Sequence, residues 1–297
     1  MKRLFVSEKG RLRPGWRVVV VLIIYSVLRS MLLAALPRAT EPSLEPNSLL
    51  QLAASLIPPT SLILATLLTL AFIDKKAVRD MGHKALRARR RHLIYGLALG
   101  AGSMSAVFAF LLALEAITLE QGLCHPQISC SLLSGLILHS FVGFSEELFC
   151  RGYIISALAE TWNLRTSAVA SSLLFSLLHV LNPNASLLGL VNTLLAGGLF
   201  AYMFVRSGNL WMPVGYHVAW NYFEGHVLGF PVSGTQVHGV YTVASSHNEF
   251  LAGGAYGPEG GFMVTLVLLA GFCLVWRSAG LCQVASRDPS AGNVNRM

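Results

Sequence analysis

Two adjacent glutamates and an arginine interrupt an apolar stretch of the sequence, residues 139–153 (HSFVGFSEELFCRGY). A charged side chain within a membrane-spanning segment is costly unless it faces a wet or protein-lined interior, so such residues point to function. Glu147 and Arg151 are four residues apart, on one face of a helix, and can form an ion pair. Glu146 points about 100° away from Glu147 and can face a different neighbour. This stretch therefore predicts a functional site on a membrane helix.

Two later apolar segments contribute polar residues that can meet Glu146: Phe175-x-x-x-His179 and His217-x-x-x-Asn221. Depth can be counted from the helix ends expected in the cytoplasm, at about 1.5 Å per residue. Glu146 and His179 then lie about 20 Å deep, and His217 and Asn221 about 10 and 16 Å deep. We therefore expect the four side chains to meet in one layer, in the inner half of the membrane.

Such a cluster suits the hydrolysis of a peptide bond. Glu146 and His179 can hold a water molecule and take its proton. His217 and Asn221 share a helix face and can donate hydrogen bonds to the oxyanion of a tetrahedral intermediate. Side-chain donors are needed because the backbone N–H groups of a membrane helix are already used within the helix. A plainer interpretation makes Glu147 and Arg151 a structural ion pair and the histidines packing residues.

The composition indicates a polytopic membrane protein. Hydrophobic residues make up 54% of the 297 residues and charged residues only 12%, about half the usual share in soluble proteins. Mean hydropathy is +0.60. The net charge of +8 does not indicate nucleic-acid binding, because the basic residues gather at the ends of apolar runs, as topology signals do. We expect no nucleic-acid partner.

Eight apolar runs are long enough to cross a membrane, which takes about 20 residues: residues 18–36, 49–73, 93–118, 131–159, 166–182, 186–205, 210–228 and 261–277. Six basic residues precede the first run and eight follow the second, which places these ends in the cytoplasm. The expected fold class is all-α: a polytopic membrane helix bundle of about eight transmembrane helices with both termini cytoplasmic. The first run is expected to be an uncleaved anchor.

Segments outside these runs carry further expectations. The basic stretch 85–91 is either a topology signal only or a short interfacial helix that binds anionic lipid, and membrane lipid is an expected partner. Residues 229–260 form a long external loop that either caps the bundle or lies on its surface. Cys124 and Cys130 share one external loop and are either a disulfide or two free thiols. Glu224 and His226 are expected near the outer surface. His139 is expected to be either a packing residue or a residue that supports Glu146.

Three motifs, in this order on separate runs, resemble the signature of the CPBP family, which comprises the type II CAAX prenyl endopeptidases and their bacterial relatives, the Abi proteins: Glu146-Glu147-x-x-x-Arg151, Phe175-x-x-x-His179 and His217-x-x-x-Asn221. The resemblance covers roughly residues 130–235. It divides the chain into N-terminal spans with basic cytoplasmic segments (1–129), a catalytic helix core (130–235), and an external loop, last span and polar tail (236–297).

The resemblance implies a metal-independent intramembrane endopeptidase with an eight-helix core and no cofactor. It implies the roles given above for the four polar residues, and it assigns Glu147 and Arg151 to the support of Glu146. The compact chain is more similar to the bacterial members, so we expect a multi-pass protein of a bacterial inner or plasma membrane. Its partner is a peptide or membrane-protein substrate whose identity the sequence does not give.

Two other functions remain open at this stage. A zinc-dependent membrane metallopeptidase could use His179, His217 and a glutamate, although the sequence has no HExxH motif. A non-catalytic immunity or scaffold protein could bind a partner through the same cavity. A transporter is a weaker alternative, because no pair of corresponding broken helices is visible. Sensitivity to a chelator separates the metal enzyme, and function of a Glu146→Gln variant separates the binding protein.

Overall fold

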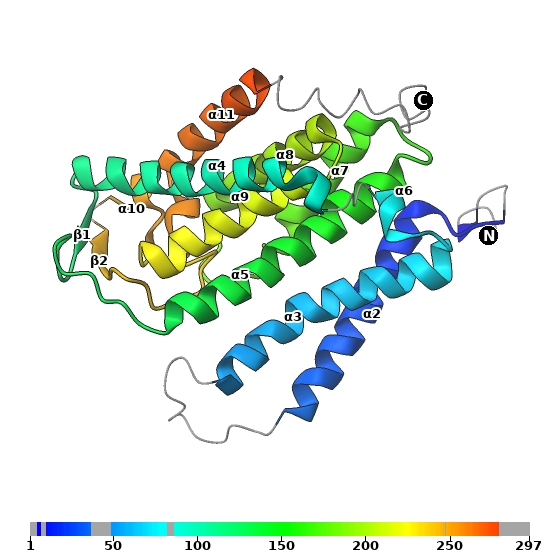
Figure 1. Cartoon of the computed structure of the whole chain (residues 1–297), viewed down its shortest axis with the longest axis horizontal. Coiled ribbons are helices and arrows are strands. Elements are labelled where there is room, and N and C mark those ends of the chain that lie inside the picture. The colour runs from blue at the N-terminus through cyan, green and yellow to red at the C-terminus, as the bar shows by residue number, and fades with distance from the viewer. Residues whose placement is uncertain (1–4, 7–9, 37–48, 82–85, 247, 279–297) are drawn as a thin grey trace.

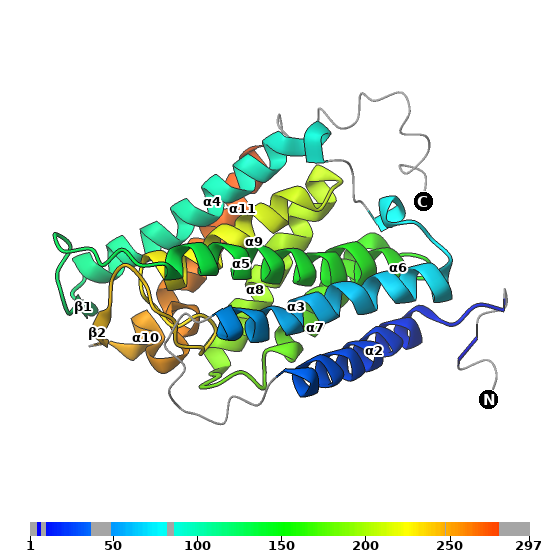
Figure 2. The same cartoon turned by 60° about the horizontal axis from the view of Figure 1, so that its bottom comes forward.

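The chain folds into a bundle of helices, shown from two sides in Figures 1 and 2. The computed structural model describes residues 5–6, 10–36, 49–81, 86–246 and 248–278. Each apolar run of the sequence corresponds to one helical segment: α2 (Pro14–Ala35), α3 (Leu49–Leu68) with η1 (Thr69–Asp74), α4 (Leu86–Ala113), α5 (Ser131–Glu147) with η3 (Leu148–Ile155) and α6 (Ser156–Leu158), α7 (Leu164–Leu178), α8 (Leu187–Ser207), α9 (Trp211–Tyr222) with η4 (Phe223–Val227), and α11 (Phe262–Arg277).

Five of the described helical segments are long and apolar enough to cross a membrane: residues 14–35, 49–74, 89–113, 131–158 and 187–207. Two further helices, α7 and α11, are apolar but shorter. The structure thus confirms a mostly helical protein with several helices that are able to cross a membrane. The total of eight spans and the cytoplasmic position of both termini stay predictions.

Close packing of α4 against α9 forms the centre of the bundle, and three glycines make it possible. A Cβ atom on Gly96 would lie 2.1 Å from the carbonyl oxygen of Met212, and one on Gly100 would lie 2.3 Å from that of Tyr216. A Cβ atom on Gly215 would lie 2.5 Å from the carbonyl oxygen of Leu93. Small residues let membrane helices approach at this distance. As a result α9, which carries His217 and Asn221, is buried along most of its length.

The N-terminal helices α2 and α3 lie along one side of the bundle, with α2 outermost (Figures 1 and 2). Only 11% of the apolar window of α2 is buried, against 50% for α8. A cluster of charged side chains ties this pair to the rest at one end. Arg17 of α2 contacts Asp74 at 3.0 Å and Glu160 at 2.8 Å, and Lys76 contacts Glu160 at 2.5 Å.

The segment between α9 and α11 folds back over the bundle. Its strand β2 (Val243–Ser246) pairs antiparallel with β1 (Ile117–Leu119), and it continues through α10 (Glu249–Ala252), η5 (Gly254–Tyr256) and η6 (Pro258–Gly260). The pairing corrects the predicted third span: α4 ends at Ala113, and Glu115 turns the chain with a positive φ of 53°. Cys124 and Cys130 are exposed free thiols. The predicted polar tail lies outside the described residues.

Candidate active site

The helix that carries the two glutamates changes its winding at the site. α5 ends at Glu147, and the next eight residues form the wider π-helix η3, which contains Arg151. The hydroxyl of Ser171 on α7 donates to the carbonyl oxygen of Cys150 at 2.6 Å. Short π-helical segments occur frequently at functional sites, because they redirect side chains and change the hydrogen bonding of the backbone.

Glu147 and Arg151 form the ion pair that their spacing predicts. The Arg151 Nη1 donates to Glu147 Oε1 at 2.9 Å, and both side chains are 0% exposed. Its Nη2 donates to the carbonyl oxygen of Gly197 on α8 at 3.0 Å. The guanidinium carbon lies 4.4 Å from the centre of the Phe175 ring and 5.2 Å from that of Phe200. Arg151 therefore has a carboxylate, a carbonyl and two aromatic rings as neighbours, which suits a buried cation.

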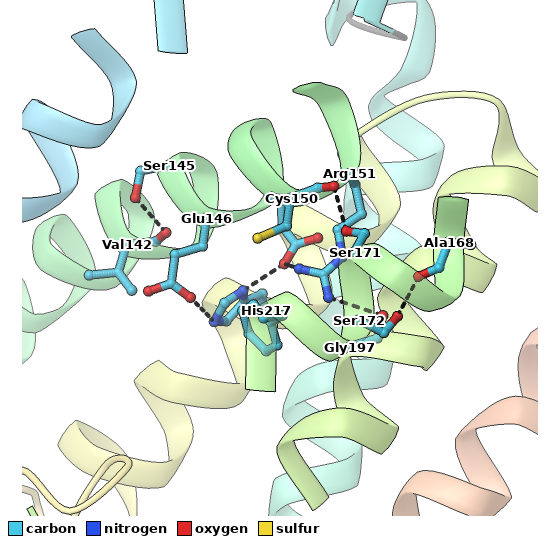
Figure 3. A network of polar contacts seen from close by, with 12 residues as sticks. Val142, Ser145, Glu146, Cys150, Arg151, Ala168, Ser171, Ser172, Gly197 and His217 are labelled. Atoms are coloured by element: carbon cyan, nitrogen blue, oxygen red, sulfur yellow. Dashed lines mark hydrogen bonds and ion pairs between the residues drawn. The ribbon is translucent and has the colours of Figure 1, made fainter. Parts of the chain in front are cut away.

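His217 joins this pair to Glu146 (Figure 3). Its Nδ1 donates to Glu147 Oε1 at 2.9 Å, since an ionised carboxylate can only accept. On the other side of the ring, Nε2 lies 3.8 Å from Glu146 Oε2. The ring also stacks on Phe200, with centroids 5.1 Å apart. The expectation was that Glu147 and Arg151 support Glu146, but the hydrogen bond of Glu147 is to His217.

His179 reaches the site from the end of α7, which stops earlier than the predicted span and leaves His179 as its C-cap. Its Nδ1 donates to the carbonyl oxygen of Phe175 at 2.7 Å. Because a carbonyl oxygen only accepts, Nδ1 carries the proton, and Nε2 of a neutral ring is a free acceptor. The ring also packs against Phe175, with centroids 4.6 Å apart.

One cavity, of about 440 Å³, is lined by all four of the polar residues that the sequence singles out: Glu146, His179, His217 and Asn221. The Glu146 side chain is 27% exposed, and its buried Oε2 has no hydrogen-bond partner in the described part of the chain. Asn221 is 8% exposed, and its side chain makes no hydrogen bond to another described residue. Glu147 and Arg151 do not line the cavity and lie behind His217.

The cavity extends beyond the helices that carry the four polar residues. Beyond the helices it is lined by Asn182, by four residues between Val232 and Val237, and by Glu259. These belong to the turns and the long loop that the sequence predicted as external. The sequence analysis did not include this loop in the site, and the depth of the site in the membrane stays a prediction.

A comparison with models of protein families finds a match for the part of the chain that contains the site. Residues 128–223 match the family model described as Type II CAAX prenyl endopeptidase Rce1-like. The resemblance to the type II CAAX prenyl endopeptidases is confirmed over these residues. The Rce1-like segment contains Glu146, His179, His217 and Asn221, and it supports an intramembrane peptidase. No curated protein matches the sequence.

Three polar residues at or near the cavity have positions that the sequence did not predict. His139 Nε2 lies 3.2 Å from His226 Nδ1, and both rings are buried, although His226 was expected near the surface. Gly135 makes room for this pair, because its Cβ would lie 2.2 Å from the His226 ring. Glu224 was also expected near the surface but is 0% exposed. Glu259 lines the cavity from outside the Rce1-like segment, and no motif in its surroundings indicates this.

No group of three or more His, Cys, Asp or Glu side chains in the described residues is arranged to hold a metal ion. His217 and His179 are each oriented by a protein acceptor at Nδ1, the carboxylate of Glu147 for His217 and the carbonyl oxygen of Phe175 for His179. Each ring thereby directs Nε2 away from that acceptor, and this orientation is what acid–base chemistry requires of a catalytic histidine.

Proposed function

We propose that this protein is an intramembrane endopeptidase that hydrolyses a peptide bond with a water molecule activated by Glu146 and His179. The observation that carries the proposal is the shared cavity, which brings an unpaired carboxylate oxygen and an oriented imidazole together with two potential oxyanion donors. The Rce1-like segment supports the reaction class. The residue roles rest on the geometry and on the resemblance of the three motifs.

The first step is attack by water. Glu146 Oε2 is buried and has no hydrogen-bond partner in the described residues, so it can accept a hydrogen bond from a water molecule in the cavity. His179 offers Nε2 as a second acceptor. As the water oxygen bonds to the carbonyl carbon of the substrate, one of these groups takes its proton. The same proton is then donated to the departing amine when the carbon–nitrogen bond breaks, so that both groups return to their starting state.

His217 is proposed to stabilise the oxyanion as an imidazolium. Its Nδ1 donates to Glu147, so Nε2 can donate into the cavity only when the ring carries both protons. With Glu146 and Glu147 ionised and Arg151 positive, a protonated His217 makes the four groups neutral overall. Charge balance within a buried cluster favours that state. Asn221 lies one turn further along α9 and supplies the second donor.

A cleavage assay tests this proposal. The purified full-length protein would be incubated in detergent with a peptide library, and products would be identified by mass spectrometry, with and without a chelator. We expect Glu146→Gln, His179→Ala and His217→Ala to lower cleavage by at least about a thousandfold, whereas Asn221→Ala leaves more activity because one donor remains. His125→Ala is the matched control, since His125 is exposed in a loop and does not line the cavity.

Each alternative has its own signature in this assay. Full activity of His179→Ala would overturn the proposed water site. Loss of cleavage with chelator, restored by zinc, would replace the mechanism by a metal-dependent one. Absence of cleavage by the wild type, together with full biological function of Glu146→Gln in cells, would indicate a protein that acts by binding.

A further inference from the structure

Glu259 brings a second carboxylate into the cavity from the far end of the chain. It belongs to η6 in the segment that folds back before α11. The side-chain amide of Asn192 on α8 donates to the backbone carbonyl oxygens of Glu259 and Gly261, at 2.8 and 2.9 Å. These bonds fix the backbone of η6 against α8. The Glu259 carboxylate therefore reaches the cavity from a backbone segment that α8 holds in place.

Only neutral donors contact this carboxylate. Trp220 Nε1 donates to Oε1 at 3.2 Å, and the Ser233 hydroxyl donates to Oε2 at 2.5 Å. No lysine, arginine or histidine of the described chain forms an ion pair with it. A carboxylate has about four acceptor positions, so two donors leave acceptor capacity and the full negative charge in place. Fully buried Glu224, whose carboxylate oxygens have no partner in the described residues, lies nearby and adds no compensating charge.

The cavity has no lysine or arginine of its own in the described part of the chain, and the positive charge proposed for His217 is already balanced within the group that it forms with Glu146, Glu147 and Arg151. Its described lining contains two carboxylates, Glu146 and Glu259, and no lysine or arginine. Arg151 lies behind His217 and is paired with Glu147. An unpaired carboxylate in a partly desolvated cavity attracts a positive group strongly, because little water screens it. The cavity is therefore complementary to a basic ligand and repels a carboxylate.

The distance along α9 relates this carboxylate to the proposed reaction. Trp220, which donates to Glu259, is three residues from His217 and adjacent to Asn221. Three residues correspond to a rise of about 4.5 Å along a helix, whereas neighbouring residues of an extended peptide are about 3.3 Å apart. A substrate whose scissile bond lies at His217 and Asn221 consequently has a residue one or two positions away within reach of Glu259.

We propose that Glu259 forms a specificity subsite for a lysine or arginine side chain of the peptide substrate, one or two residues from the cleaved bond. The inference rests on the proposed function and names the substrate class for that site. It also means that a substrate with a free C-terminal carboxylate at this position is rejected. If Glu259 served only to hold Trp220 and Ser233 in place, the same two hydrogen bonds would form. The protein would then show no preference for a positively charged side chain in its substrate.

Peptides that differ at a single residue test the subsite. A peptide cleaved by the wild-type protein would be remade with lysine, norleucine or glutamate at each position near the cleaved bond, and kcat/KM would be measured. We expect lysine at one position to exceed norleucine by at least about tenfold, as for hydrogen bonds between charged groups, and glutamate to be worst. Glu259→Gln, which keeps acceptor and size, should bring lysine and norleucine within about twofold.

Two further variants make the result specific. Glu259→Lys should invert the order, so that glutamate becomes better than lysine. Glu249→Gln is the matched control, because Glu249 is an exposed acid in the same loop and does not line this cavity; it should retain the wild-type preference. Cleavage with equal rates for lysine and norleucine peptides, or a preference that survives in Glu259→Gln, would overturn the subsite while leaving the proposed function intact.

A binding measurement separates failure of the subsite from failure of the proposed function. Fluorescently labelled lysine, norleucine and glutamate peptides would be titrated with full-length Glu146→Gln and Glu146→Gln/Glu259→Gln in detergent. We expect about tenfold tighter binding of the lysine peptide, lost in the double variant. If this binding preference is observed but the wild-type protein cleaves none of the peptides, the proposed peptidase function is refuted and the subsite is retained. Equal binding of all three peptides would refute the subsite.

Discussion

The molecule contains two clusters of oppositely charged side chains that differ in burial and in what surrounds them. Glu147 and Arg151 are 0% exposed and have His217, aromatic rings and a backbone carbonyl as neighbours. In the other cluster, which joins Arg17, Asp74, Lys76 and Glu160, two side chains are 33% and 27% exposed. The comparison shows that similar ion pairs have different uses: the buried cluster orients a residue at the cavity, and the outer one holds α2 beside the bundle.

The largest effect is expected from Arg151→Met. It leaves Glu147 buried without its cation, which typically costs about 3–5 kcal/mol, and it frees His217 from its fixed position. Thermal unfolding in detergent would measure the loss of stability, and the cleavage assay the loss of activity. The double variant Glu147→Gln/Arg151→Met should regain part of the stability but not the activity. If the two substitutions destabilise additively, the pair is not coupled as the geometry indicates.

An intermediate effect is expected from Gly197→Ala. The added Cβ would lie 3.3 Å from Arg151 Nη2, 3.2 Å from Ser172 Cα and 3.3 Å from the Phe175 ring. These contacts displace the guanidinium from the Gly197 carbonyl, so we expect activity to fall about tenfold with a loss of stability of about 1–2 kcal/mol. Gly198→Ala is the adjacent control, because its Cβ meets only Phe272, at 3.5 Å. Equal activity of the two variants would show that the position of Arg151 is not critical.

The smallest effect is expected from Glu160→Gln in the outer cluster. Solvent screens this carboxylate, so we expect a loss of stability below about 1 kcal/mol and cleavage within about twofold of the wild type. A decrease in activity as large as that of Gly197→Ala would mean that the outer cluster also controls the site, and the contrast between the two clusters would fail.

The environment of Glu160 predicts that the stability of the protein depends on pH. Partial burial acts to raise the pKa of Glu160, but hydrogen bonds from Arg17 and Lys76 outweigh it and hold the pKa below its usual value of 4.5. The stabilisation is therefore fully present above about pH 4.5 and disappears as the pH falls through the lower folded-state pKa. Unfolding curves of wild type and Glu160→Gln should converge in that acidic range. Curves that remain equally separated below it would contradict this assignment.

The sequence predicted the helices and the ion pair of the buried cluster because both depend on short-range patterns. Apolar runs defined the eight helical segments, and the four-residue spacing gave the Glu147–Arg151 pair. The second partner of Glu147, His217, was not predicted, because that contact spans 70 residues and depends on how closely α9 packs. The roles of the four cavity residues stay predictions, although the structure brings them to one cavity.

Residues near the returning loop were harder to predict. His226 and Glu224 lie near the end of an apolar run, where a polar side chain usually reaches water. Their burial results from the loop above them and from the space that Gly135 leaves. Glu259 is followed by the last helix and has no periodic signal, so only the fold shows that it lines the same cavity as Glu146. Packing between distant segments, and not local preference, decides these positions.

The strand pair β1–β2 has a consequence for how the protein is made. Ile117 pairs with Ser246, so the loop that lines the cavity is anchored only when the chain has been synthesised well beyond the proposed catalytic helices. At about 5–20 residues per second, the ribosome needs a few seconds to add the residues between these helices and Ser246. During that time the helices with Glu146, His179 and His217 can already be in the membrane, without the wall that holds Glu259. The order of synthesis thus places the cavity wall with the proposed Glu259 subsite after the helices that carry the proposed catalytic residues.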